Sequence, residues 1–334
     1  MVRRLTGERA DIDVAIARLD AIEAAWRARM AAEDAAQALV AWQEESPHVE
    51  ADRVLRDEAV AAARALVAAG VSDAFEWQTM MLDRNDARLA LLMRDMGGTN
   101  ARATLAAALG VPLESTRDLV LTADADSPPP PYAELRARML TSHPLILRAL
   151  AAHAQAERDL ALAVAAQYPT VQLSPGYFLD QGDHVWSLLG GIVVPLFARH
   201  DVAIDSAAAA RDAARDAVYA AQASALAELE RAHAAWQAAA TVPAGERARV
   251  AGIGGRPAEI RPKRLQGNGD NLAVARAAVQ LAQARLRLAA AEGEERRTRT
   301  ALLAATRAAD ANSPFGRTLD EMLAAPGAQE GTSR

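Results

Sequence analysis

Apolar and polar positions follow helical spacing along most of this 334-residue chain, in segments rich in alanine. Alanine has the highest helix propensity but buries little surface, so such helices pack over long, narrow contacts. The pattern predicts helices at residues 10–45, 50–69, 73–108, 132–166, 201–240 and 271–309. Prolines and glycines predict breaks or loosening at Ser46-Pro47, Gly97-Gly98 and His143-Pro144, and an irregular basic segment over residues 245–269.

Residues 170–197 are the stretch whose pattern is not helical. Two apolar, aromatic and β-branched runs of about ten residues flank a polar turn at 180–184, which predicts a β-hairpin. About ten residues is also the length that a tilted strand needs to cross a bilayer. The second run has one apolar face, but its other face, which includes Leu189 and Val193, is not polar, so a membrane strand and a buried hairpin both remain open. A hairpin set between helices leaves its edges unpaired and therefore predicts an assembly.

An internal repeat divides the chain. Trp42-Gln43 and Trp236-Gln237 each end an alanine-rich segment, and a glycine-containing break follows each at a similar distance, at Gly70 and Gly267. Each unit is therefore expected to be a long helix, a tip and a returning helix. The expected organisation is a first helical repeat at 1–121, a Pro-rich connector at 122–131, a second repeat at 132–311 that holds the hairpin, and a disordered tail at 312–334.

Two further expectations come from this repeat. The strand pair of the first unit would fall before Met1, so we expect that pair to be missing from the chain. After the first tip, Ser72 or Asp73 is expected to cap the returning helix, with Glu76 placed as the partner of Asp73.

Composition and charge narrow the function classes. The net charge of −6 with mixed signs argues against a nucleic-acid surface, which would be basic and clustered. There is no cysteine, hence no disulfide or thiolate site, and the six histidines do not pair at metal-ligand spacing. No catalytic constellation stands out, so we expect no enzyme, no cofactor and no metal site. Met1-Val2-Arg3-Arg4 is not followed by the apolar segment of a secretory leader, and no apolar run is long enough for a transmembrane helix.

Several short motifs resemble the TolC family of outer-membrane efflux proteins. The hairpin is similar to its second strand pair at Tyr168-Pro169, Val171-Gln172-Leu173, Gly176-Tyr177, Trp186-Ser187-Leu188 and Val194-Pro195-Leu196-Phe197. Ser142-His143-Pro144-Leu145 resembles the opening of the family's second repeat, and residues 105–112 resemble the end of its first. The resemblance covers residues 10–310 and is closest to the CzcC-like branch, which acts in heavy-metal and drug efflux.

The resemblance implies a mainly α fold, in which long Ala-rich helices form a periplasmic α-barrel and one β-hairpin per protomer contributes to a trimeric outer-membrane β-barrel. The implied function is the outer-membrane channel component of a tripartite efflux pump, a passive exit duct for metal ions or small toxic molecules, located in the outer membrane and periplasm. Implied partners are two further copies in a homotrimer, a periplasmic adaptor protein, an inner-membrane pump and outer-membrane lipid, without nucleic acid. The alternative is a soluble coiled-coil scaffold or interaction protein with no transport role.

Two groups of site residues follow from the same resemblance. The tips that would contact the adaptor contain Gly70, Val71, Ser72, Asp73, Gly267, Asn268, Gly269 and Asp270. The strands that would line and anchor the barrel contain Val171, Leu173, Tyr177, Trp186, Leu188, Ile192, Val194 and Leu196, with Tyr177 and Trp186 as candidate interface aromatics. Some members of the family carry tunnel-gating aspartates after the second tip, where this chain has Ala273 and Arg276.

Overall fold

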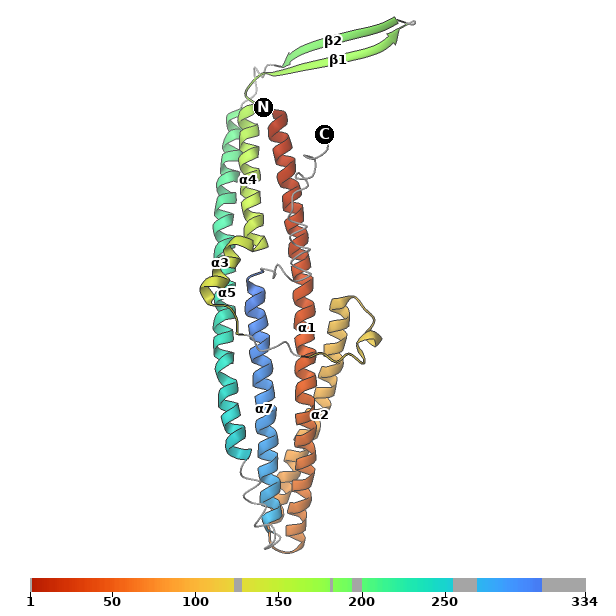
Figure 1. The fold of residues 1–334 in the computed structure, drawn as a ribbon, viewed down its shortest axis with the longest axis vertical. Helices are drawn as coiled ribbons and strands as arrows, with labels where there is room; N and C mark the ends of the chain where they lie inside the picture. Colours follow the sequence, from red (N-terminus) through yellow and green to blue (C-terminus); the bar gives the residue numbers. More distant parts are fainter. Residues whose placement is uncertain (1, 123–127, 181–182, 194–199, 255–268, 308–334) are drawn as a thin grey trace, which may run out of the picture. The chain divides into compact units, whose positions relative to one another are not determined.

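The computed structural model describes residues 2–122, 128–180, 183–193, 200–254 and 269–307 (Figure 1). In chain order the elements are α1 (Val2–Ala68), α2 (Ala74–Leu109), the 3-10 turn η1 (Leu113–Thr116), α3 (Tyr132–Ser142), α4 (Pro144–Ala165), β1 (Thr170–Asp180), β2 (Asp183–Val193), α5 (His200–Gly254) and α7 (Gly269–Ala305). The predicted mainly α fold with one hairpin is confirmed for these residues. Val194, Leu196, Gly267, Asn268 and the predicted tail at 312–334 lie outside the described residues.

The break predicted at Ser46-Pro47 is wrong, because α1 runs through Pro47 without interruption. Proline removes one backbone donor and usually breaks a helix. Side chains supply hydrogen bonds one turn earlier. The Ser46 hydroxyl donates to the Trp42 carbonyl at 2.5 Å, and the Arg94 guanidinium donates to the carbonyls of Ala41 and Trp42 at 2.9 and 2.8 Å. The carbonyl that Pro47 deprives of its helical donor belongs to Gln43, so these bonds support the turn before the proline and do not replace the lost bond.

The irregular segment predicted from Gly245 is also wrong in its first part. Helix α5 continues through Pro243 and Gly245 to Gly254. Pro243 is fully buried, so the packing of its ring offsets the loss of one backbone hydrogen bond. The loosening predicted at Gly97-Gly98 is absent too, because α2 is continuous from Ala74 to Leu109.

The described residues belong to two compact units, and each unit draws segments from both predicted repeats. The first unit comprises Met1–Ala24, Arg136–Ala227 and Arg307–Arg334, and the second comprises Ala25–Leu135 and Glu228–Thr306. The boundaries predicted for the repeats and the connector concern duplication within the sequence, whereas the two units are defined by compactness. The predicted boundaries therefore stay a prediction.

Polar pairs join the beginning of α1 to α4 in the first unit. Arg9 Nε donates to Asp159 Oδ1 at 2.5 Å, and Arg148 Nε donates to Asp20 Oδ1 at 2.5 Å. All four side chains are about half exposed, so each pair contributes no more than about 1 kcal/mol and serves to set the register of the two helices.

The break predicted at His143-Pro144 is confirmed between α3 and α4. His143 is the N-cap of α4, where its Nδ1 accepts a hydrogen bond from the Leu145 backbone N–H at 3.3 Å, and Pro144 occupies the first helical position. The imidazole is 0 % exposed, and Nε2 has no hydrogen-bond partner among the described residues. Burial, and secondly the positive charge of Arg307, lower the pKa of His143 from 6.5 to about 4.

This buried histidine predicts a pH dependence of stability. Between pH 6.5 and about 4 the unfolded chain binds a proton at residue 143 that the folded chain does not bind, so the free energy of unfolding should fall as the pH falls through this window. His143→Asn keeps a capping acceptor but cannot titrate. Urea unfolding of both proteins across the window checks this: the variant should lose less stability on acidification, and equal slopes would contradict the assignment.

In the second unit, α1 and α2 pack against each other through a cluster of apolar side chains. Its core is formed by Ala35, Leu39, Ala101 and Leu105, with Leu119 and Leu121 of the following segment packed against it. At the other end of the two helices, Ala63 and Leu66 of α1 contact Leu272 of α7, with Trp77 and Met80 of α2 alongside. These two clusters fix the three helices that carry the tip.

Candidate functional site

The two strands of the hairpin pair in a simple antiparallel register. Tyr177 lies opposite Trp186, Val171 opposite Ile192, and Asp180 opposite Asp183. Because side chains alternate between the two faces of a strand, this register assigns every residue to one of two faces. We call the face that contains Trp186 the apolar face.

Every predicted membrane residue that lies within the described strands is on the apolar face. These residues are Val171, Leu173, Tyr177, Trp186, Leu188 and Ile192, and Leu179 joins them. Their exposed fractions run from 54 % for Tyr177 to 77 % for Trp186, so none of the residues that the structure describes covers them. A continuous exposed apolar surface of this kind marks an interaction with lipid or with another apolar surface.

The opposite face is more polar than the second strand suggests by itself. Leu189 is exposed there, but its cross-strand partner is Ser174, and the next pair along this face is Gly176 and Ser187. Both strands therefore contribute hydroxyl and small residues to this face, Ser174 and Gly176 from β1 and Ser187 and Gly191 from β2. The hairpin has one apolar face and one mixed face of small, hydroxyl and scattered apolar residues, which is typical of strands with lipid on one side.

Aromatic rings gather on the apolar face toward the turn. The ring centroids of Tyr177 and Trp186 are 4.7 Å apart, and the Tyr177 hydroxyl hydrogen-bonds to Nδ1 of His184. Amphipathic rings of this kind favour the boundary between hydrocarbon and water. In the described sheet each strand pairs only with the other, so both outer edges of the hairpin present unpaired backbone groups.

The first predicted tip closes as expected. Helix α1 ends at Ala68, Gly70 adopts φ +70°, and the Val71 N–H donates to the Leu66 carbonyl at 2.9 Å, which is a left-handed helix ending that glycine favours. Asp73 caps α2 by accepting from the Phe75 N–H at 3.1 Å. The side chain of Val71 is 69 % exposed.

One detail of the tip differs from the prediction. Glu76 does not act as the partner of Asp73: it accepts a hydrogen bond from the Ser72 hydroxyl at 2.7 Å and forms an ion pair with Arg276. Arg276 belongs to the first turns of α7, the helix that begins at Gly269 and Asp270. The structure therefore brings the first turns of α7, which follow the second predicted tip, against the start of α2.

A groove of about 560 Å³ opens beside the Glu76–Arg276 pair, lined by side chains of α1, α2 and α7 that include Arg56, Thr79 and Gln280. Sequence reasoning missed both the ion pair and the groove. The sequence gives only an indirect signal of the ion pair, because Glu76 lies at the start of α2 and Arg276 lies soon after the glycine of the second predicted tip.

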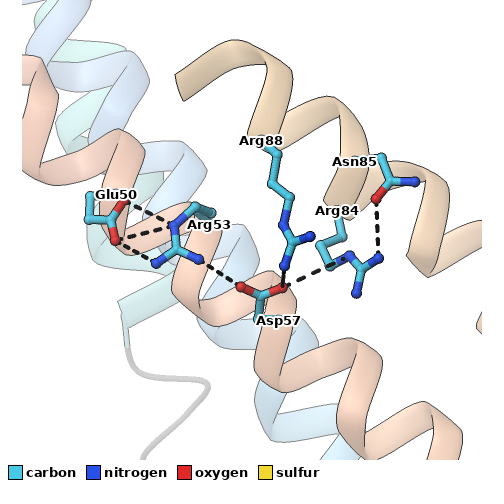
Figure 2. Close-up of polar contacts among 6 residues, drawn as sticks. All are labelled: Glu50, Arg53, Asp57, Arg84, Asn85 and Arg88. Atoms are coloured by element: carbon cyan, nitrogen blue, oxygen red, sulfur yellow. Dashed lines mark hydrogen bonds and ion pairs between the residues drawn. The ribbon is translucent and has the colours of Figure 1, made fainter. Parts of the chain in front are cut away.

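Figure 2 shows a polar network that links α1 to α2 farther from the tip. Asp57 accepts from Arg53 of α1 at 2.8 Å and from Arg88 of α2 at 3.2 Å, and Arg84 lies 3.9 Å away. Arg53 also pairs with Glu50 at 2.6 Å, and this hydrogen bond lowers the pKa of Glu50. Arginines of α1 and α2 surround the Asp57 carboxylate, which suits a clamp between the two helices.

Two further findings concern the part of the chain that the structure describes. No three His, Asp or Glu side chains come together there as ligands of a metal ion. No helix in it has the length and apolar character required to cross a membrane.

No protein-family model and none of the curated proteins matches the sequence. Solved structures match its fold. The outer membrane protein VceC of Vibrio cholerae has a TM-score of 0.73 and 19 % identity, over 91 % of this chain and 75 % of VceC. The outer-membrane channel OprN has a TM-score of 0.71 and 19 % identity, over 91 % of this chain and 70 % of OprN.

The CmeC outer membrane channel of Campylobacter jejuni agrees, with a TM-score of 0.73 and 13 % identity over 96 % of this chain and 71 % of CmeC. These similar proteins are channels and not enzymes. At such low identity the likeness concerns the fold. The chain has the TolC-type fold of these outer-membrane channels.

Proposed function

We propose that this protein is the outer-membrane channel component of a tripartite efflux pump and acts as a passive exit duct for metal ions or small toxic molecules. The observation that carries the proposal is the hairpin, in which strands of bilayer-crossing length display one exposed apolar face on a helical fold shared with outer-membrane channels. The proposal of a metal or drug substrate rests on the resemblance of the sequence to the CzcC-like branch.

The open edges of the hairpin support an assembly in the membrane. A strand edge cannot remain unpaired in hydrocarbon, because no water is present to bond its N–H and C=O groups. Closure into a barrel with strands from other copies satisfies these edges. We propose a homotrimer in the outer membrane with its helices in the periplasm.

The tip is the proposed docking site for a periplasmic adaptor protein, which would connect the channel to an inner-membrane pump. The tip residues are Gly70, Val71, Ser72, Asp73, Gly269 and Asp270, together with Gly267 and Asn268 outside the described residues. The support is local: an exposed valine beside a rigid turn, a capped helix start and an adjacent groove.

The tip proposal predicts that Val71→Asp weakens adaptor binding without changing the fold, because the Val71 side chain is exposed and only its backbone bonds to α1. A charge introduced into the centre of an apolar contact costs about 2–4 kcal/mol, which is roughly 30-fold or more in affinity. The matched control is Val120→Asp, at a valine of the same unit that is 77 % exposed and far along the chain from the tip. Co-purification with the adaptor measures the difference, and equal binding by both variants would remove the tip from the docking site.

The function itself is tested at the native locus. Deletion of the gene should lower the minimal inhibitory concentrations of transported metals or drugs, and reintroduction should restore them. Fractionation should place the protein in the outer membrane. If the protein stays soluble and resistance does not change, the scaffold alternative takes the place of the efflux proposal.

A further inference from the structure

We infer that an apolar stripe on the outer face of α2 packs against a small-residue seam on α5 of a second copy. The stripe consists of Phe75, Leu82, Leu89 and Met96, with Leu92 and Met93 beside it. The seam consists of Ala234, Ala238, Thr241, Gly245, Ala248 and Gly252. This inference rests on the proposed channel assembly and identifies the surfaces that would join its copies.

The stripe lies opposite the buried side of α2. The residues that face α1, such as Ala101 and Leu105, are buried, whereas Phe75, Leu82, Leu89 and Met96 are 72, 65, 56 and 72 % exposed. These four residues are spaced seven apart, which is the period of a left-handed coiled coil. Surface positions away from a helical seam normally carry polar residues, so a heptad of large apolar residues there predicts a second helix as partner.

The seam on α5 has the complementary shape. Its six residues alternate in steps of four and three, all are exposed, and none is larger than threonine. Among the described residues, an added Cβ at Gly245 would meet no atom within 4 Å, and the same holds for Gly252. Glycine within a helix costs up to about 1 kcal/mol relative to alanine, so two glycines on an open helical face favour the close approach of another backbone. Large residues on α2 can then fit over small ones on α5.

The stripe and the seam also lie at the same level along the helix axes. Glu76 of α2 pairs with Arg276 of α7, and Glu292 of α7 pairs with Arg247 of α5 at 2.8 Å. With a rise of about 1.5 Å per residue on each helix, residues 89–96 of α2 stand level with residues 243–250 of α5. When copies are related by an axis parallel to the helices, each residue keeps its level along that axis. The part of the stripe with the most apolar residues therefore meets the middle of the seam.

Charge complementarity favours a second copy as the occupant. Asp86 flanks the stripe and Arg249 flanks the seam; both side chains are exposed, and neither forms an ion pair among the described residues. Helices α2 and α5 run in opposite directions in the unit (Figure 1). In an antiparallel pair, flanking positions on the same side of each seam become neighbours, which brings Asp86 of one copy toward Arg249 of the next. A contact between two different faces of the same chain is heterologous, and such contacts form a ring when the rotation between copies closes, as in the proposed trimer.

The first test is cross-linking, which benefits from the absence of native cysteines. Leu89→Cys combined with Ala248→Cys should be joined between copies by a short bismaleimide and should give dimer and trimer bands on a denaturing gel. The controls are each single variant, and Ala65→Cys with Ala248→Cys, because Ala65 is exposed on α1 away from both surfaces. Cross-linking to a different protein, or intact trimers that do not cross-link, would overturn the inference.

Charge reversal is a second, independent test of the interface, and it does not require the cysteine variants to fold. Asp86→Arg and Arg249→Asp should each reduce the trimer fraction on native gels severalfold, and the double reversal should restore it. No recovery in the double variant would count against the pairing. Copies that cross-link but show no efflux would support this interface and reject the proposed function. Trimers that show efflux but do not cross-link would support the proposed function and reject this interface.

Discussion

Leu188→Lys is expected to abolish stable insertion of the protein in the outer membrane, whereas Leu189→Lys is expected to be tolerated. The two leucines are adjacent in β2 and equally exposed, at 73 and 70 %, but they lie on opposite faces of the hairpin. A lysine on the lipid face of a barrel strand costs about 2–4 kcal/mol near the middle of the bilayer. In a symmetric assembly that cost applies once per copy. On the mixed face the same lysine can remain in water.

The measurement is the amount of each variant that remains in the outer-membrane fraction as heat-stable oligomer. Total expression of the two variants is compared in parallel, so that general instability is recognised. If Leu189→Lys were the damaging change, the apolar face would not be the lipid face. If both lysines were tolerated, the hairpin would not be in lipid, and the scaffold interpretation would gain the support that efflux loses.

Gly98→Ala is expected to destabilise the protein by about 1–3 kcal/mol, because overpacking of a close contact forces its surroundings to move. A Cβ at this position would overlap the indole ring of Trp42 and lie 2.7 Å from Cζ2. The ring has little freedom to retreat. Its Nε1 donates to the Arg94 carbonyl at 2.9 Å, and the Arg102 guanidinium lies 4.7 Å from the ring centroid.

The neighbouring glycine is the control. A Cβ at Gly97 would meet no atom of the described part of the chain within 4 Å, so Gly97→Ala should stabilise α2 by up to about 1 kcal/mol through helix propensity. Thermal unfolding followed by circular dichroism should therefore move in opposite directions for two substitutions of the same chemistry, one residue apart. Equal shifts for the two variants would mean that the Trp42 contact does not hold α1 against α2.

Local chemistry was predictable from the sequence where one residue type decides the geometry. Gly70 and Gly110 both adopt the left-handed conformation at helix ends, and His143 stands at the predicted break before a proline. The same rules failed at Pro47 and Pro243, where the helix continues although one backbone donor is lost. Pro243 is fully buried, and side chains bond to the carbonyls of the turn before Pro47.

The candidate site divides in the same way. Alternation within a single strand identified the apolar face, but the nature of the other face depends on which β1 residue lies opposite Leu189, and the length of the turn decides that. The pairing of Glu76 with Arg276 joins residues about 200 positions apart and depends on the contact between α1 and α7, which no local pattern encodes. The stripe on α2 and the seam on α5 could not be predicted from the sequence, because only the burial of each residue in the fold distinguishes inner from outer helix positions.

The two unpaired edges of the hairpin have a consequence for the life of a newly made chain. Two strands alone are marginally stable in water, so β1 and β2 gain most of their stability when neighbouring strands arrive. Until then, each copy carries an adhesive strand edge beside an exposed apolar surface, which is the usual template for aggregation. In the proposed assembly, folding of this part is coupled to association, and its yield should depend on concentration and on holdase chaperones that shield the edge.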